Sequence, residues 1–194
     1  MDTPVRPEPE LTTRLKRLVR SRYGLWILGL ISFVESSLLL PIIVDPFLVM
    51  YVQGHRSRAL TAVIVTIITS VMGGIMAFLC AYFFQSLVFS VVDPGILSSI
   101  DPFVERFRDQ TFLFSLFGSI VLLPYTLIAM AAGFMKANIS MFILGAILGR
   151  TIRFGFVGYL TYLIGSRATV YLKRHLLILG GLVLLGIIVY ALWT

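Results

Sequence analysis

The chain has 194 residues, of which 58% are hydrophobic and only 13% are charged, and its mean hydropathy is +0.97. A soluble domain carries about 25% charged residues, so this composition argues against that class and predicts a polytopic membrane protein. The formal net charge of +7 indicates basic flanks beside anionic headgroups rather than a nucleic-acid interface, because no groove-reading or base-stacking motif occurs. A single cysteine, Cys80, excludes an intramolecular disulfide.

Residues 1–22 are predicted to form a polar tail followed by an interfacial amphipathic helix. From Leu11, leucine and valine recur at helical spacing, and arginine and lysine fill the positions between them. Such a helix lies on an anionic leaflet, although a short solvated linker helix has the same pattern. The basic cluster predicts a cytoplasmic N-terminus. The apolar segment that begins near Tyr23 is expected to be retained rather than cleaved.

The apolar segment over residues 23–54 contains acids and helix breakers that need a functional explanation: Glu35, Asp45, Pro41 and Pro46. Basic residues flank it on both sides, so both ends are expected in the cytoplasm. Its 32 residues are too few for two crossings of about 20 residues each. A re-entrant hairpin with its turn near Pro41 to Pro46 satisfies both conditions; the alternative is one tilted, kinked span.

The rest of the chain alternates between spans and a second hairpin. Residues 59–90 are apolar, uncharged and predicted to span, whereas residues 94–109 are rich in acids and are predicted to be an outer amphipathic connection. Residues 111–135 are again short and are broken by Pro124, which favours a second re-entrant hairpin. Residues 138–165 and 176–193 are each long enough to span.

An internal repeat supports this layout. Residues 39–41 match residues 122–124 as Leu-Leu-Pro, and residues 81–86 resemble residues 161–166, at offsets of 83 and 80. One unit starts in the cytoplasm and the other outside, so the units would be inverted, an arrangement typical of transporters. Chance similarity between apolar sequences is the alternative.

The predicted fold is therefore an all-α polytopic membrane protein with two inverted repeats. Each repeat is a re-entrant helical hairpin followed by a transmembrane helix. An interfacial N-terminal helix precedes them and a C-terminal transmembrane helix follows them. Residues 23–194 are expected to form a single membrane domain.

The candidate site combines charges from both repeats. Glu35 and Asp45 belong to the first hairpin, and two arginines, Arg150 and Arg153, belong to the span after the second. A charge at the membrane centre costs at least about 2.5–3.5 kcal/mol, so pairing or hydration is close to obligatory. The carboxylates could exchange protons, and the arginines suit a phosphate, which they grip bidentately. The alternative is a buried salt-bridge network that only stabilises the fold.

Other residues of the hairpins are candidates for breaking the helices or lining a cavity: Ser36, Ser37, Pro41, Pro46, Pro124, Tyr125, Thr126 and Gly133. The serines could equally hydrogen-bond backbone carbonyls, and Asp45 could equally cap the helix that begins at Pro46. The sequence has no Cys/His cluster, phosphate-cradling loop or nucleophile–base pair. No metal, cofactor or enzymatic activity is therefore expected.

The motif from Phe33 to Pro46, with Glu35-Ser-Ser followed by Pro41 and Asp45, resembles the first hairpin of the DedA family, the bacterial members of the VTT (SNARE-associated) superfamily. The resemblance extends over residues 23–193 and is strongest to the YqaA-like branch. It includes the Ala-Gly at 132–133, the tyrosine-containing span, and the stretch around Gly149, Arg150 and Arg153.

This resemblance implies two facing re-entrant hairpins and lipid transport, with Glu35 and Asp45 as essential membrane acids. The activities it implies are flipping or scrambling of phospholipids driven by the proton motive force, or recycling of a polyprenyl-phosphate carrier. The second hairpin departs from the family pattern. Many relatives carry arginine near its proline, whereas residues 118–126 here contain none. Only Arg150 and Arg153 remain for that role.

The expected function is therefore that of a lipid transporter in the bacterial inner membrane. Its partners would be membrane lipids, including an anionic or phosphate-bearing lipid, and protons; no nucleic acid is expected, and a homo-oligomer is compatible with the sequence. The alternatives are a non-transporting membrane scaffold or assembly factor and a proton-coupled small-ion antiporter.

Overall fold

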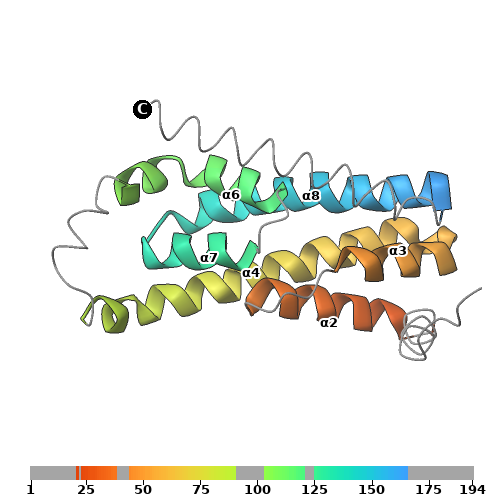
Figure 1. The fold of residues 1–194 in the computed structure, drawn as a ribbon, viewed down its shortest axis with the longest axis horizontal. Helices are drawn as coiled ribbons and strands as arrows, with labels where there is room; N and C mark the ends of the chain where they lie inside the picture. Colours follow the sequence, from red (N-terminus) through yellow and green to blue (C-terminus); the bar gives the residue numbers. More distant parts are fainter. Residues whose placement is uncertain (1–20, 22, 39–43, 91–102, 121–124, 166–194) are drawn as a thin grey trace, which may run out of the picture.

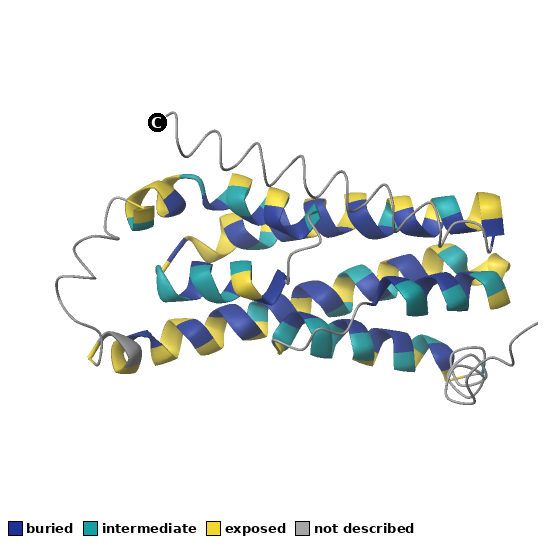
Figure 2. Cartoon of the chain, viewed as in Figure 1, coloured by how far each residue is buried: buried dark blue, intermediate teal, exposed yellow. Residues whose placement is uncertain are grey.

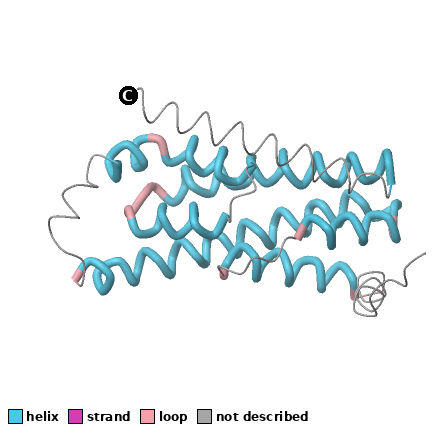
Figure 3. Tube along the Cα trace, in the orientation of Figure 1, coloured by secondary structure: helices cyan, strands magenta, loops and turns pink. Residues whose placement is uncertain are grey.

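The computed structural model describes residues 21, 23–38, 44–90, 103–120 and 125–165, and every regular element in these ranges is helical (Figure 3). The elements are α2 (Gly24–Ser37), α3 (Asp45–Gly54), the 3-10 helix η1 (Arg56–Arg58), α4 (Ala59–Phe89), α6 (Thr111–Ile120), α7 (Tyr125–Phe134) and α8 (Ile139–Ile164). Residues 103–109 form a further short helix. The all-α prediction is confirmed.

Several predictions concern parts of the chain outside the described residues. These are the N-terminal tail and nearly all of its interfacial helix, residues 94–102 of the outer connection, and the C-terminal span over residues 176–193. Pro41 and Pro124 are also outside them. The outer connection is therefore described only from residue 103, where its helix is seen.

Two helices are long and apolar enough to cross a membrane. The residues that qualify are Arg56–Leu87, which include most of α4, and Ile139–Ile164, which are α8. At 1.5 Å per residue, 32 and 26 residues are about 48 and 39 Å long, more than the roughly 30 Å of a bilayer's hydrocarbon core. Buried core helices of soluble proteins can be equally long and apolar, and the outer surface of these helices distinguishes the two classes.

The outer surface of α4 is apolar along its length. Large side chains are exposed at every fourth position: Leu60, Ile64, Ile68, Met72 and Met76. In Figure 2, exposed residues (yellow) lie on the outward sides of the long helices. Monomeric soluble proteins rarely expose contiguous apolar patches larger than a few hundred Å². This surface therefore supports a membrane protein.

The four shorter helices end near the middle of the bundle. In Figure 1, α2 runs from one end to the middle and α3 returns to that end, while α6 and α7 do the same from the opposite end. The long helices α4 and α8 pack on each other. The first arms α2 and α6 pack on α4 and α8 respectively, and the second arms cross over, α3 to α8 and α7 to α4.

The contacts of α2 with α4 and of α6 with α8 use the same chemistry. Ser32 donates its hydroxyl to the carbonyl oxygen of Thr66 at 2.9 Å, and Ser115 donates to that of Phe142 at 2.7 Å. In lipid, such hydroxyl bonds hold helices together where the hydrophobic effect does not.

Glycines let the same helix pairs approach closely. A Cβ added at Gly73 would lie 2.9 Å from the Cβ of Ser36, and one added at Gly149 would lie 2.6 Å from that of Ser119. Both separations are too short for real Cβ atoms. Both glycines lie near the middle of their helices, so the closest packing is at the level where the short helices end.

Candidate functional site

Helices α2, α3, α4, α6, α7 and α8 contain four charged residues, and all four lie near the middle of the bundle. Glu35 is in the last turn of α2, Asp45 is the first residue of α3, and Arg150 and Arg153 lie one turn apart in α8. Their formal charges sum to zero, and each of the four interacts electrostatically with others of the set.

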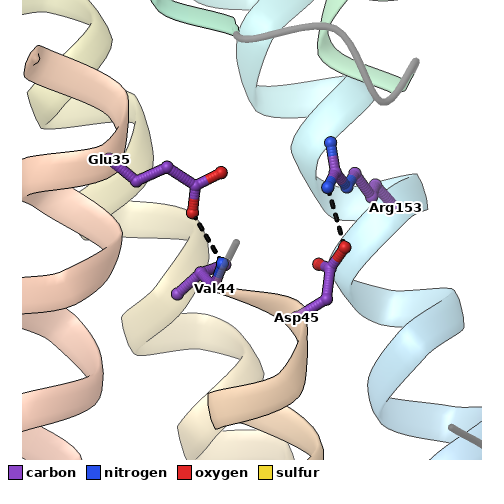
Figure 4. A network of polar contacts seen from close by, with 4 residues as sticks. All are labelled: Glu35, Val44, Asp45 and Arg153. Carbon is purple, nitrogen blue, oxygen red and sulfur yellow. Dashed lines mark hydrogen bonds and ion pairs between the residues drawn. The ribbon is translucent and has the colours of Figure 1, made fainter. Parts of the chain in front are cut away.

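Asp45 and Arg153 form a buried ion pair. Nη2 of Arg153 donates to Oδ2 of Asp45 at 2.8 Å, and the two side chains are 4% and 10% exposed, respectively (Figure 4). The pair joins α3 to α8. Val44 is the N-cap residue of α3, and α3 has no side-chain capping hydrogen bond. The carboxylate of Asp45 pairs with Arg153 instead of capping the helix. The partial positive charge of a helix N-terminus also favours its carboxylate.

Glu35 binds the backbone rather than an arginine. Its Oε2 accepts a hydrogen bond from the backbone N–H of Val44 at 2.8 Å (Figure 4). Val44 immediately precedes Asp45, so Glu35 links the end of α2 to the start of α3. The first amide groups of a helix have no intrahelical partner, and a carboxylate satisfies one well. Pro46 suits this first turn because it has no N–H to satisfy.

Arg150 is held by aromatic rings. Its residue is 1% exposed, and its guanidinium carbon lies 4.1 Å from the ring centroid of Tyr125 and 5.3 Å from that of Phe154. Its Nε and Nη1 have no hydrogen-bond partner among the described residues. Arg153 thus donates a hydrogen bond to an acid, whereas Arg150 interacts with Glu35 and Asp45 through its charge.

The ring of Tyr125 fits into space left by a glycine. A Cβ at Gly74 would overlap the tyrosine ring, so only glycine at this position leaves room for it. Tyr125 is 3% exposed and stacks on Phe142 with ring centroids 6.0 Å apart. Its hydroxyl also has no partner among the residues that the structure describes. The adjacent glycines Gly73 and Gly74 can be read from the sequence, whereas the tyrosine that packs against Gly74 is seen only in the structure.

The predicted serines are used within the protein. The Ser36 hydroxyl is 2.7 Å from that of Ser70 on α4, and the Ser37 hydroxyl donates to the carbonyl oxygen of Val34 at 3.4 Å. Both arrangements fit a structural role, which was one of the two alternatives for these residues.

Thr126 connects the two helical hairpins. Its hydroxyl donates to the carbonyl oxygen of Glu35 at 2.8 Å and reaches that of Leu38 at 3.3 Å. It thereby satisfies carbonyl groups at the C-terminal end of α2 from the start of α7. Gly133, at the other end of α7, packs against α4, where an added Cβ would lie 2.9 Å from the Cβ of Ala81. Tyr125 therefore contacts α4, and Thr126 contacts α2.

Comparison with known proteins assigns no activity. No family model matches the chain, and no solved structure matches it. An uncharacterized protein of Haemophilus influenzae is 25% identical over 173 residues, which cover 88% of this chain and 90% of that protein. The class that the fold defines is thus an all-helical protein with two helices long and apolar enough to cross a membrane.

Proposed function

We propose that this chain is a lipid transporter of the flippase or scramblase type in the bacterial inner membrane. It would move a phosphate-bearing lipid, such as a phospholipid or a polyprenyl phosphate. The observation that carries the proposal is the buried Arg150, whose Nε and Nη1 have no hydrogen-bond partner in the described part of the chain. A guanidinium in this position, inside helices with apolar outer faces, suits an anionic headgroup that travels within the membrane.

The α2–α3 and α6–α7 pairs would be re-entrant hairpins. At 1.5 Å per residue, α2 with 14 residues is about 21 Å long and the three 10-residue helices are about 15 Å, so none crosses a core of roughly 30 Å. Broken helices at membrane depth are tolerated where protein or a polar cavity covers them. The basic N-terminal flank would place the N-terminus in the cytoplasm.

The two halves would be inverted repeats, and the contacts of the helices support this. The serine hydroxyl bonds and the close glycine contacts between α2 and α4 recur between α6 and α8. In both kinds of contact, residues of α2 correspond to residues of α6 at an offset of 83, and residues of α4 correspond to residues of α8 at an offset of 76. The corresponding pairs are Ser32 and Ser115, Ser36 and Ser119, Thr66 and Phe142, and Gly73 and Gly149. This register differs from the offset of 80 suggested by residues 81–86 and 161–166.

An apolar groove suits the acyl chains of such a lipid. It has a volume of about 370 Å³ and lies between α2 and α4. Its lining includes Trp26, Leu30 and Phe33 from α2, and Val65 and Met72 from α4. An acyl chain there would stay in apolar surroundings while its headgroup enters the polar cluster.

Protons would act through the acids. Protonation of Asp45 removes the charge that holds Arg153, which then becomes available to a phosphate. Loss of that proton restores the ion pair and releases the phosphate. Glu35 would act in the same way on the start of α3, because its charge strengthens the hydrogen bond from Val44.

A membrane scaffold is the second candidate, and a specific observation favours it. Glu35 and Asp45 both have partners that join helices, which is what purely structural charges would do. A scaffold needs only that the charges compensate each other. Exchange of the pair, Asp45→Arg with Arg153→Asp, would then restore function in cells, and no lipid movement would be seen.

Reconstitution of the full chain in vesicles with fluorescent phospholipids tests the proposal. Accessibility of the label to an impermeant quencher measures movement between leaflets. We expect Glu35→Gln, Asp45→Asn and Arg150→Ala to slow lipid movement at least tenfold, and Arg58→Ala, at an exposed arginine of η1, to leave it unchanged. If all three folded variants move lipid at the parent rate, the proposal is wrong.

A further inference from the structure

The two buried arginines have different surroundings. Arg153 is bound to Asp45, whereas the described contacts of Arg150 are with the rings of Tyr125 and Phe154. The acid on the adjoining arm, Glu35, binds the amide of Val44. Arg150 therefore has two buried donors, Nε and Nη1, without an acceptor among the described residues, and it lacks the ion pair that Arg153 makes, so the two arginines are not an equivalent pair.

Stacking places Arg150 without using its hydrogen-bond donors. A cation over an aromatic face gains up to about 2 kcal/mol when the site is desolvated, and at 4.1 Å the guanidinium lies well within the range of this interaction. A cation–π contact depends on the charge of the guanidinium and needs none of its N–H groups, so Nε and Nη1, which have no partner among the described residues, remain able to donate. The tyrosine thus orients the cation and leaves its donors for a ligand.

The same tyrosine supplies a second donor, its hydroxyl, which lies beside Gly74 of α4. Its hydroxyl is buried, and it is unpaired among the described residues, as are Nε and Nη1 of Arg150. A buried tyrosine usually finds a hydrogen-bond partner for its hydroxyl, since leaving the group unsatisfied is costly. The position of the ring is itself built into the fold, because Gly74 provides the space that it occupies.

We propose that Tyr125 and Arg150 form one phosphate-binding subsite, in which the tyrosine positions the guanidinium and donates its hydroxyl to the same phosphate group. Arg153 is outside this subsite while it is bound to Asp45. A phosphate has several acceptor oxygens, so it can accept from a guanidinium and a phenol together. The inference rests on the proposed function for the origin of the ligand, but the subsite itself requires only a phosphate.

Substitutions of Tyr125 separate its two roles. Tyr125→Phe keeps the stacking and removes the hydroxyl, and a hydrogen bond to a charged group is worth enough to weaken phosphate binding about tenfold. Tyr125→Leu also removes the aromatic face and is expected to weaken binding further. Tyr159→Phe, on the exposed side of α8, is the matched control and should bind like the parent.

The test is a calorimetric titration of the full chain in an uncharged, phosphate-free detergent. The probes are dihexanoyl phosphatidic acid, inorganic phosphate and, as the uncharged control, dihexanoylglycerol. Parent binding of either phosphate probe, weakened about tenfold by Tyr125→Phe and lost in Arg150→Lys, would support the subsite. Tighter binding of the lipid probe would identify a headgroup as the ligand, whereas equal binding would identify the free phosphate ion.

Two results would overturn the subsite: parent protein that binds neither phosphate probe, or Tyr125→Phe that binds both as tightly as the parent. Melting temperatures identify variants that fail to fold, and Tyr125→Phe keeps nearly all of the buried volume. Lipid movement by the same proteins separates the two proposals. If the parent binds phosphate through Tyr125 but moves no lipid, the subsite stands and the transporter proposal fails. If lipid moves and Tyr125→Phe matches the parent in binding, the reverse holds.

Discussion

Removal of one charge from the Asp45–Arg153 pair is expected to destabilise the bundle strongly. The pair joins α3 to α8 through a 2.8 Å bond, and both side chains are almost completely buried. In Asp45→Asn the guanidinium keeps its charge and loses its counter-charge. Water cannot compensate for the loss, because the first residue of α3 is covered by the surrounding helices.

The size of the effect follows from the burial of the pair. Loss of one member of a buried ion pair costs about 3–5 kcal/mol, because an uncompensated charge remains inside the protein. For a domain of this length, each kcal/mol lowers the melting temperature by about 2–4 °C, so the expected decrease is about 6–20 °C. Removal of both charges avoids the uncompensated charge and is often close to neutral.

Thermal unfolding in one detergent provides the measurement. The four proteins to compare are the parent, Asp45→Asn, Arg153→Gln and the double variant, with Arg58→Gln as the exposed-arginine control. We expect the double variant to be more stable than either single variant, although it carries more substitutions. Two single variants that each melt within about 2 °C of the parent, or that add without coupling in the double variant, would refute the buried ion pair.

Two further predictions concern contacts between helices. Gly73→Ala forces a methyl group against Ser36 and is expected to lower the free energy of unfolding in detergent by about 1–3 kcal/mol. Gly155→Ala is the control, because a Cβ at Gly155 would have nothing within 4 Å, and this change should be neutral or stabilising. Equal effects of the two substitutions would contradict the close contact at Gly73. Thr126→Val removes the hydrogen bond from the Thr126 hydroxyl to the carbonyl oxygen of Glu35 and should lower the free energy of unfolding by about 1 kcal/mol. Thr126→Ser keeps the hydroxyl and should retain most of this stability. Equal stability of the valine and serine variants would count against the bond.

The sequence alone determined the helical character of the protein and its two long apolar helices. Both follow from local properties, because hydropathy summed along a segment needs no knowledge of its neighbours. It also identified the four charges inside apolar segments, since a charge in such a segment stands out whatever it binds. Pro46 in the first turn of α3 was also visible, because proline interrupts a helix whatever it contacts.

The sequence predicted an internal repeat with an offset of 80 in its second part, whereas the contacts of α4 and α8 correspond at an offset of 76. Residues 81–86 and 161–166 look alike largely because both are apolar, and Tyr82 and Tyr162 are exposed. Exposed apolar positions tolerate many substitutions, so similarity there does not define a packing register. The hydroxyl and glycine contacts do, because a shift of one residue would move them off the partner helix.

Only the tertiary structure decided which charge meets which partner. Asp45 and Arg153 are 108 residues apart, and Arg150 and Arg153 are equally plausible partners by sequence. At about 100° per residue, these arginines point in directions about 60° apart, so the position of α3 against α8 selects one of them. The other arginine meets Tyr125 because Gly74 on α4 leaves room for the ring. Such choices depend on packing between distant segments, whereas the charges themselves were already visible in the sequence.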